Sequence, residues 1–269
     1  MTRLLLLVAA LGLGLGLLLT ACARQEDETW SRVAESGVLR VGMDASFPPF
    51  ESIEADGTLS GLDVALAQEL GRRLGVETQF VANLPYDGLY DALTARRVDV
   101  VISSLVIVPE RQADFAYSTP YFDAGLVLVT RDDEAGQAIE RTGDLAGRVL
   151  AVEFGSTGDM EARRLARRLR GLITRPYETA DAALAAVADG QADAALVDHV
   201  SALLGDDPAR HLRIVEPPFA PEPYAVAMRA DSPHLLQAIN DALAAMADDG
   251  TLAALQGRYL SGGHPQGQP

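Results

Sequence analysis

The sequence predicts an α/β fold of two lobes, each a mostly parallel sheet with helices on both faces, joined by two crossing strands. Two separate series of alternating strand and helix patterns run along the chain, and a long β-prone segment follows each series. A chain of 269 residues is long enough to form two modest hydrophobic cores.

The first series shows strand and helix patterns in alternation. Strand patterns cover residues 38–43, 76–81 and 98–103, and helix patterns cover 63–75 and 86–97. In the first helix, leucine recurs at every fourth position, at Leu62, Leu66, Leu70 and Leu74. Asp63 is expected to be its N-cap and Gly75 to end it.

The second series repeats this order. Strand patterns cover 149–154 and 194–197, helix patterns cover 159–170 and 179–189, and residues 232–259 are helical with a break at 248–250. Residues 125–131 and 223–229 are expected to cross between the lobes, with proline-rich 217–223 leading into the second crossing. We therefore expect lobe 1 at 37–124 and 223–262, lobe 2 at 125–222, and a disordered tail at 263–269.

The N-terminus predicts export. Arg3 precedes an unbroken apolar run from Leu4 to Leu19, which is short for a membrane span and typical of a signal peptide, expected at 1–21. An uncleaved membrane anchor is the alternative. Leu19-Thr20-Ala21-Cys22 resembles the bacterial lipobox, which implies cleavage before Cys22, acylation of this residue and stable attachment to a membrane, with 22–36 as a lipidated tether. Cys22 is the single cysteine, so no thiol is left for a disulfide, a metal site or catalysis.

Charge and motif content exclude several classes of function. The chain has no lysine, and removal of residues 1–21 leaves 21 arginines against 38 acidic residues, a net charge of −17. This balance argues against a nucleic-acid partner, which needs a basic face. No nucleotide-binding or hydrolase motif occurs, and the four histidines, at 199, 211, 234 and 264, lack metal-ligand spacing. We expect no cofactor and no metal.

Candidate binding residues lie at the ends of the predicted strands, where ligands of open α/β sheets bind. These ends hold one arginine, several hydroxyl groups, three carboxylates and aromatic rings: Asp44, Phe47, Ser103, Ser104, Arg111, Glu153, Ser156, Thr157 and Asp198. The set suits an α-amino acid, because a guanidinium binds a carboxylate bidentately. Arg111 would bind the α-carboxylate and Asp198 the α-ammonium, and the loop at 155–158, which opens a helix, also favours a negative group.

Each of these residues has a purely structural interpretation. Arg111 could be a surface arginine, and Asp198 could be the N-cap of the helix that follows it. Ser156 or Thr157 could cap a helix in the same way, and Asp44 could form an Asx-turn before two prolines. The aromatic residues Phe47, Phe50 and Tyr86 could belong to the core.

Taken together, five segments resemble the family 3 extracellular solute-binding proteins, the periplasmic receptors of polar amino-acid ABC transporters. The segments span nearly all of the mature chain in the family's order: 39–75, 101–125, 144–160, 192–199 and 239–260. The resemblance implies the two-lobed type II periplasmic binding-protein fold.

The resemblance also implies roles for single positions. Arg111 falls at the carboxylate-binding arginine and Asp198 at the amine-binding aspartate. Phe47 and Tyr86 fall where rings pack along the ligand side chain, and Asp44 and Glu153 where that side chain is recognised. Two departures stand out: Ala65 replaces a common aspartate, and Val106 and Val108 replace hydroxyl residues near the arginine.

We expect a monomeric, non-enzymatic receptor, lipid-anchored through Cys22 and facing the periplasm or the cell exterior, that delivers an amino acid to ABC permease subunits. Two carboxylates with aromatic rings between them favour a basic ligand, with glutamine or another polar amino acid as the alternative.

A cyclohexadienyl or arogenate dehydratase on the same fold is the main rival function, with Glu153 or Asp44 as a general acid. A receptor's sensor domain is disfavoured, because no second membrane segment follows. The sequence specifies neither the affinity nor the permease.

Overall fold

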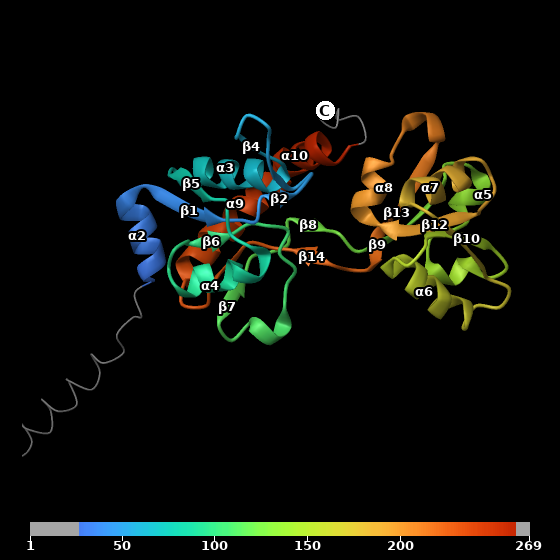
Figure 1. Ribbon diagram of the computed structural model, residues 1–269, viewed down its shortest axis with the longest axis horizontal. Coiled ribbons are helices and arrows are strands. Elements are labelled where there is room, and N and C mark those ends of the chain that lie inside the picture. The colour runs from blue at the N-terminus through green and yellow to red at the C-terminus, as the bar shows by residue number, and fades with distance from the viewer. Residues whose placement is uncertain (1–26, 262–269) are drawn as a thin grey trace, which may run out of the picture.

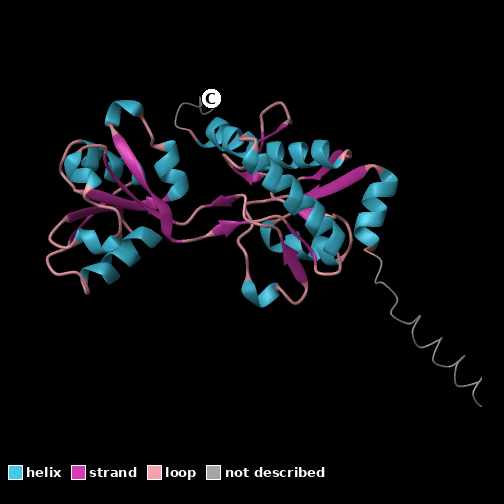
Figure 2. Ribbon diagram, turned by 180° about the vertical axis from the view of Figure 1, so that it is seen from behind, coloured by secondary structure: helices cyan, strands magenta, loops and turns pink. Residues whose placement is uncertain are grey.

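The molecule has two lobes, which two extended segments connect (Figures 1 and 2). The computed structural model describes residues 27–261. The helices are α2 (Glu28–Ser36), α3 (Leu62–Leu74), α4 (Leu89–Thr94), α5 (Glu134–Gln137), α6 (Thr157–Ala166), α7 (Ala180–Ala188), α8 (His199–Leu204), α9 (Pro233–Asp248) and α10 (Thr251–Leu260). Short 3₁₀ turns are η1 (Tyr86–Gly88), η2 (Pro109–Arg111), η3 (Thr142–Leu145) and η4 (Pro208–Arg210).

Lobe 1 is built on a five-stranded sheet of order β5-β1-β6-β15-β7. Its strands are β1 (Val38–Gly42), β5 (Glu77–Val81), β6 (Val100–Val101), β7 (Phe115–Tyr117) and β15 (Ala227–Arg229). The first three pair in parallel, as the βαβαβ pattern predicts, whereas β15 pairs antiparallel with both β6 and β7. A small antiparallel sheet of β2 (Ser46–Phe47), β3 (Glu51–Ile53) and β4 (Leu59–Ser60) lies beside it.

Lobe 2 repeats this plan with the order β11-β10-β12-β9-β13. Its strands are β9 (Leu126–Arg131), β10 (Val149–Glu153), β11 (Ile173–Tyr177), β12 (Ala194–Asp198) and β13 (Leu212–Ala220). The strands β11, β10 and β12 run in parallel, and β9 and β13 complete the sheet antiparallel. Both sheets are therefore mixed, and each has a buried apolar cluster on either face.

The two connections between the lobes lie side by side. In the first, β8 (Phe122–Asp123) leads into β9, and in the second, β13 leads into β14 (Pro223–Tyr224). The strands β8 and β14 pair with each other, and β9 pairs with β13. Gly125 is required at this point, because a Cβ there would lie 2.1 Å from the carbonyl oxygen of Ala220. We call β8, β14 and the residues that join them to β9 and β13 the hinge.

Helix α2 differs from the sequence expectation, which placed residues 22–36 in a tether. Residues 28–36 instead form a helix on lobe 1, with Thr29 and Val33 buried. The Asp27 carboxylate accepts from the Trp30 backbone N–H at 2.8 Å and from the His234 backbone N–H at 2.8 Å, so that it caps both α2 and α9. These contacts fix α2 to the lobe, and the part of the expected tether before residue 27 lies outside the described residues.

The start of α3 also differs from the expectation, whereas its end is confirmed. Gly61, rather than Asp63, is the N-cap, and Asp63 is fully buried with its carboxylate turned toward the loop that follows β6. At the other end Gly75 is the C-cap, in a left-handed conformation with φ +71° that glycine adopts without strain. The predicted helix 86–97 is shorter than expected, since it consists of η1 and α4.

Candidate functional site

Most of the residues expected to bind a ligand line two depressions, one in each lobe. The lobe 1 depression, of about 300 Å³, is lined by Asp44, Ser46, Phe47, Glu51, Tyr86, Ser103, Ser104, Val106, Glu222 and Tyr224. The lobe 2 depression, of about 160 Å³, is lined by Leu126, Glu153, Ser156, Thr157, Gly158, Val197 and Asp198. Both depressions border the hinge, through Tyr224 in the first and Leu126 in the second.

Arg111 lines neither depression. It lies at the end of η2, and its guanidinium carbon stacks 4.3 Å from the centre of the Tyr90 ring. No ion pair of Arg111 occurs in the part of the chain that the structure describes. The arginine therefore keeps an unpaired charge on lobe 1, where it stacks on Tyr90 and lines neither depression.

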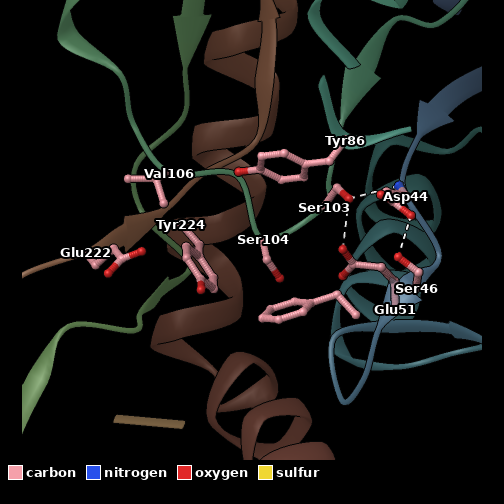
Figure 3. Close-up of a pocket in the computed structure, with 10 residues that line it drawn as sticks. Asp44, Ser46, Glu51, Tyr86, Ser103, Ser104, Val106, Glu222 and Tyr224 are labelled. Atoms are coloured by element: carbon pink, nitrogen blue, oxygen red, sulfur yellow. Dashed lines mark hydrogen bonds between the residues drawn. The ribbon is translucent and has the colours of Figure 1, made fainter. Parts of the chain in front are cut away.

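Ser103 forms the floor of the lobe 1 depression (Figure 3). Its hydroxyl accepts from the Asp44 backbone N–H at 3.0 Å and donates to the Glu51 carboxyl at 2.8 Å. The side chain is completely buried. Because its proton is already directed to Glu51, the Ser103 hydroxyl is not free to donate to a ligand carboxylate.

Two buried acids, Glu51 in the lining of the depression and Asp63 behind it, were not among the site residues expected from the sequence. Glu51 is 1% exposed and Asp63 is completely buried. Burial, and then the neighbouring charge of Asp63, raises the pKa of Glu51. Burial also raises the pKa of Asp63, against hydrogen bonds from Glu51, Ser104 and Tyr121 that favour its charged form. Glu51 is therefore the member of the pair that holds a proton at neutral pH.

Asp63 determines the shape of the loop beside Ser103. Its Oδ2 accepts from the Ser104 backbone N–H at 2.6 Å and from the Tyr121 hydroxyl at 2.9 Å. Ser104 adopts a left-handed backbone with φ +48°, which is unfavourable for a residue with a side chain. The buried carboxylate stabilises this conformation and so places Ser104 at the edge of the depression.

Aromatic rings form the open side of the lobe 1 depression. Phe47 and Tyr86 are about half exposed, so neither belongs to the core. The Phe47 ring stacks on Phe50 with centres 5.7 Å apart, and Phe50 packs against Phe122 and Tyr224 at 5.4 Å each. Burial, and then the charge of Glu222, raises the pKa of Tyr224, and Asp198 of lobe 2 contributes in the same direction.

In lobe 2, two of the expected binding residues also cap helices. Ser156 is the N-cap of α6, where its hydroxyl accepts from the Asp159 backbone N–H at 3.1 Å and donates to the Glu153 carbonyl at 2.8 Å. Asp198 is the N-cap of α8, since its Oδ1 accepts from the Ser201 backbone N–H at 2.8 Å. The capping interpretation is therefore correct for both residues, and it leaves the second oxygen of Asp198 available in the depression.

No group of three or more histidine, cysteine or acidic side chains in residues 27–261 is arranged to hold a metal ion. Among the same residues, no helix is long and apolar enough to cross a membrane.

Comparison with known proteins identifies the family. The sequence profile of the bacterial extracellular solute-binding proteins, family 3, matches residues 39–262. The chain belongs to this family. It is thus an extracellular solute-binding protein, in a family of binding proteins rather than enzymes, and the two-lobed fold expected from the resemblance is confirmed.

The chain is similar to proteins of more than one kind. The L-cystine-binding protein TcyJ of Escherichia coli (strain K12) is 33% identical over 231 residues, which cover 86% of this chain and 85% of TcyJ. A solved ancestral cationic amino acid solute-binding protein is 32% identical with a TM-score of 0.63, covering 87% of this chain and all of that one. A solved ancestral cyclohexadienyl dehydratase is 28% identical with a TM-score of 0.70, covering 85% of this chain and 95% of that one.

Proposed function

We propose that this solute-binding protein takes up an amino acid with a basic side chain between its lobes and presents it to an ABC permease. The observation that carries the proposal is the composition of the lobe 1 depression. Three acidic residues, Asp44, Glu51 and Glu222, line it together with the half-exposed rings of Phe47 and Tyr86, and no basic residue lines either depression. Aromatic faces attract cations, and carboxylates repel an acidic ligand.

The α-amino and α-carboxylate groups would be held by the two lobes together. Asp198 offers one carboxylate oxygen to the ammonium group, and Thr157 begins helix α6, whose N-terminal backbone N–H groups favour an anion. Arg111 stacks on the Tyr90 ring in lobe 1 and would leave this ring to bind the carboxylate. Because neither lobe completes the site alone, binding and closure are coupled.

Glu51 is a further group that a basic side chain would engage. Its carboxyl lines the depression and makes a side-chain hydrogen bond to Asp63. A ligand cation beside it would favour the ionised form, so that binding of the ligand releases a proton. Proton release therefore distinguishes a basic ligand from glutamine, which would release no proton.

Isothermal titration calorimetry tests the proposal with arginine, lysine, ornithine, glutamine, cystine and glutamate. We expect the basic amino acids to bind most tightly, and their apparent enthalpy to change with the ionisation enthalpy of the buffer because of the released proton. Tightest binding of glutamine or cystine would refute the basic ligand while leaving an amino-acid receptor. No binding by any of them would refute the function itself.

Asp198→Asn is the matched variant for the amine half of the site. Asparagine caps a helix as well as aspartate, so α8 should retain its start and the melting temperature should stay the same. The affinity for the amino acid should fall at least tenfold, because the neutral amide cannot pair with the ammonium group. Unchanged affinity would exclude Asp198 from the amine site.

We further propose that the mature protein is a monomeric lipoprotein, attached to the membrane through Cys22 and facing the periplasm or the cell exterior. The support is the apolar run at 4–19 and the lipobox-like residues 19–22, all of which lie outside the described residues. Metabolic labelling with an alkyne fatty acid should label the wild-type chain and not Cys22→Ser. Light scattering of the released protein should give the mass of one chain.

A further inference from the structure

His199 directly follows Asp198, the residue expected to bind the ligand's ammonium group. Its side chain faces the hinge and not the lobe 2 depression. The side chain is buried, with 8% of its surface exposed, although it begins a helix. Its Nδ1 lies 2.8 Å from the carbonyl oxygen of Asp123 in β8. Its ring stacks on Phe122, with ring centres 5.3 Å apart and planes inclined by 17°. A lobe 2 side chain is thus fixed on the first crossing.

The other ring nitrogen faces the second crossing. Nε2 lies 3.2 Å from Oε1 of Glu216 in β13, at an ion-pair distance although the angle is not that of an aligned hydrogen bond. A carbonyl oxygen can only accept, so Nδ1 must donate to Asp123. Nε2 can then donate to the carboxylate only if the ring is the imidazolium. Both contacts are satisfied together by the protonated side chain.

Helix α8 itself lies between the lobes. Val200 and Leu203 pack against the main apolar cluster of lobe 1, although α8 follows the lobe 2 strand β12 directly. A cavity of about 500 Å³ lies beside His199, between α8 and α10. Two kinds of contact therefore hold helix α8: the apolar contacts of Val200 and Leu203 with lobe 1, and the contacts of the His199 ring with the hinge.

We propose that His199 is a positioning residue that fixes helix α8, and with it Asp198, against both crossings of the hinge. This inference rests on the proposed function for the role of Asp198. The residues are consecutive, and the His199 backbone N–H donates to the Gly125 carbonyl at 3.0 Å. A shift of the ring therefore moves the carboxylate that would receive the ligand's ammonium group.

The charged surroundings of His199 indicate how pH acts on this contact. Glu216 faces Nε2, and Asp206 lines the same cavity. The Asp123 carboxylate already accepts from the backbone N–H groups of Gly125 and Glu222, and that of Asp198 caps α8. From α10 and the residue after it, the cavity is lined by groups that do not titrate in this range: Ala253, Gln256, Gly257, Leu260 and Ser261. Histidine ordinarily changes charge between pH 5 and pH 8, and only its imidazolium donates from both ring nitrogens.

Spin-label distance measurements without ligand test the inference directly. One label goes on each lobe, at the exposed positions Ala55 and Arg168, in a full chain carrying Cys22→Ser. We expect a narrower distribution of interlobe distances at pH 5.5 than at pH 8.5. His199→Ala should give a broad distribution at both pH values, and Glu216→Gln should weaken the pH dependence. The inference is overturned if His199→Ala retains the wild-type width or its pH dependence.

Binding measurements supply the second arm. His199→Ala should weaken the binding of the tightest amino acid about three- to tenfold at pH 5.5. His199→Asn keeps a donor for the Asp123 carbonyl and should recover part of that loss, with an affinity that no longer depends on the charge at this position. Equal affinities and equal pH profiles in all three proteins would refute the positioning role.

The two arms separate the two proposals. If the wild-type chain binds no amino acid, the proposed function fails, and the ligand-free distances still decide the role of His199. If the wild-type chain binds and the variants do not differ from it, the positioning role alone fails. Should His199→Ala not fold, the wild-type pH series and Glu216→Gln, a change at an exposed carboxylate, provide the same test.

Discussion

Replacing Asp63 tests whether its buried carboxylate fixes the loop at the floor of the lobe 1 depression. In Asp63→Ala, the Ser104 backbone N–H and the Tyr121 hydroxyl lose the carboxylate oxygen that lies 2.6 Å and 2.9 Å from them. Each orphaned buried donor costs about 1–3 kcal/mol, so the free energy of unfolding should fall by about 2–6 kcal/mol. An exposed N-cap aspartate, the role expected from the sequence, would cost only about 0.5–2 kcal/mol.

Asp63→Asn is the matched control, because its amide oxygen can still accept from both donors. Its amide N–H₂ can also donate to the Glu51 carboxyl, so that the side-chain hydrogen bond between the two residues is kept. Urea unfolding of the three proteins at pH 7 should therefore place asparagine much closer to aspartate than to alanine. A loss of less than about 1 kcal/mol in Asp63→Ala, or equal losses in both variants, would refute the assignment.

Three further variants test other parts of the molecule. Since the pKa of Glu51 is raised in the folded state, the unfolded chain loses this proton first. Wild-type stability should therefore fall as pH rises above the ordinary value of 4.5, by up to about 1.4 kcal/mol per pH unit, and Glu51→Gln should flatten that slope in urea titrations at pH 6 and pH 9. Arg111→Lys should weaken ligand binding at least tenfold in calorimetry, because lysine lacks the bidentate fork, and unchanged affinity would remove Arg111 from the carboxylate site. Gly125→Ala forces a Cβ against the Ala220 carbonyl and should lower stability by about 1–3 kcal/mol in thermal unfolding, whereas a neutral result would mean that the crossings can separate freely.

The sequence predicts those elements whose local pattern agrees with their place in the fold. The regular leucines of α3 and the glycine at its end specify one helix, and the structure confirms it. Strand β13 was not predicted, because the proline-rich residues 217–223 were interpreted only as the approach to the second crossing. The prolines are accommodated where the register with β9 shifts, between Val215 and Ala220.

The candidate site is predictable only where its residues follow strands. Asp44, Ser103 and Asp198 were found because each lies at or beside a strand end. Glu51 and Asp63 were missed because their pairing depends on a small hairpin that folds back over α3, and a single sequence holds no periodic signal for such a contact. The one available clue was an acidic residue directly after Phe50, an aromatic residue that could belong to the core.

The attachment of α2 to lobe 1 has a mechanical consequence. Asp27 ties α2 to α9, and Arg32 and Arg40 converge on the buried Asp99, so a pull on the chain at Asp27 is borne within lobe 1. Lobe 2 lies at the opposite end of the molecule (Figure 1). The contacts that hold α2 therefore do not involve the hinge. Lobe 1 can act as a fixed base while lobe 2 moves.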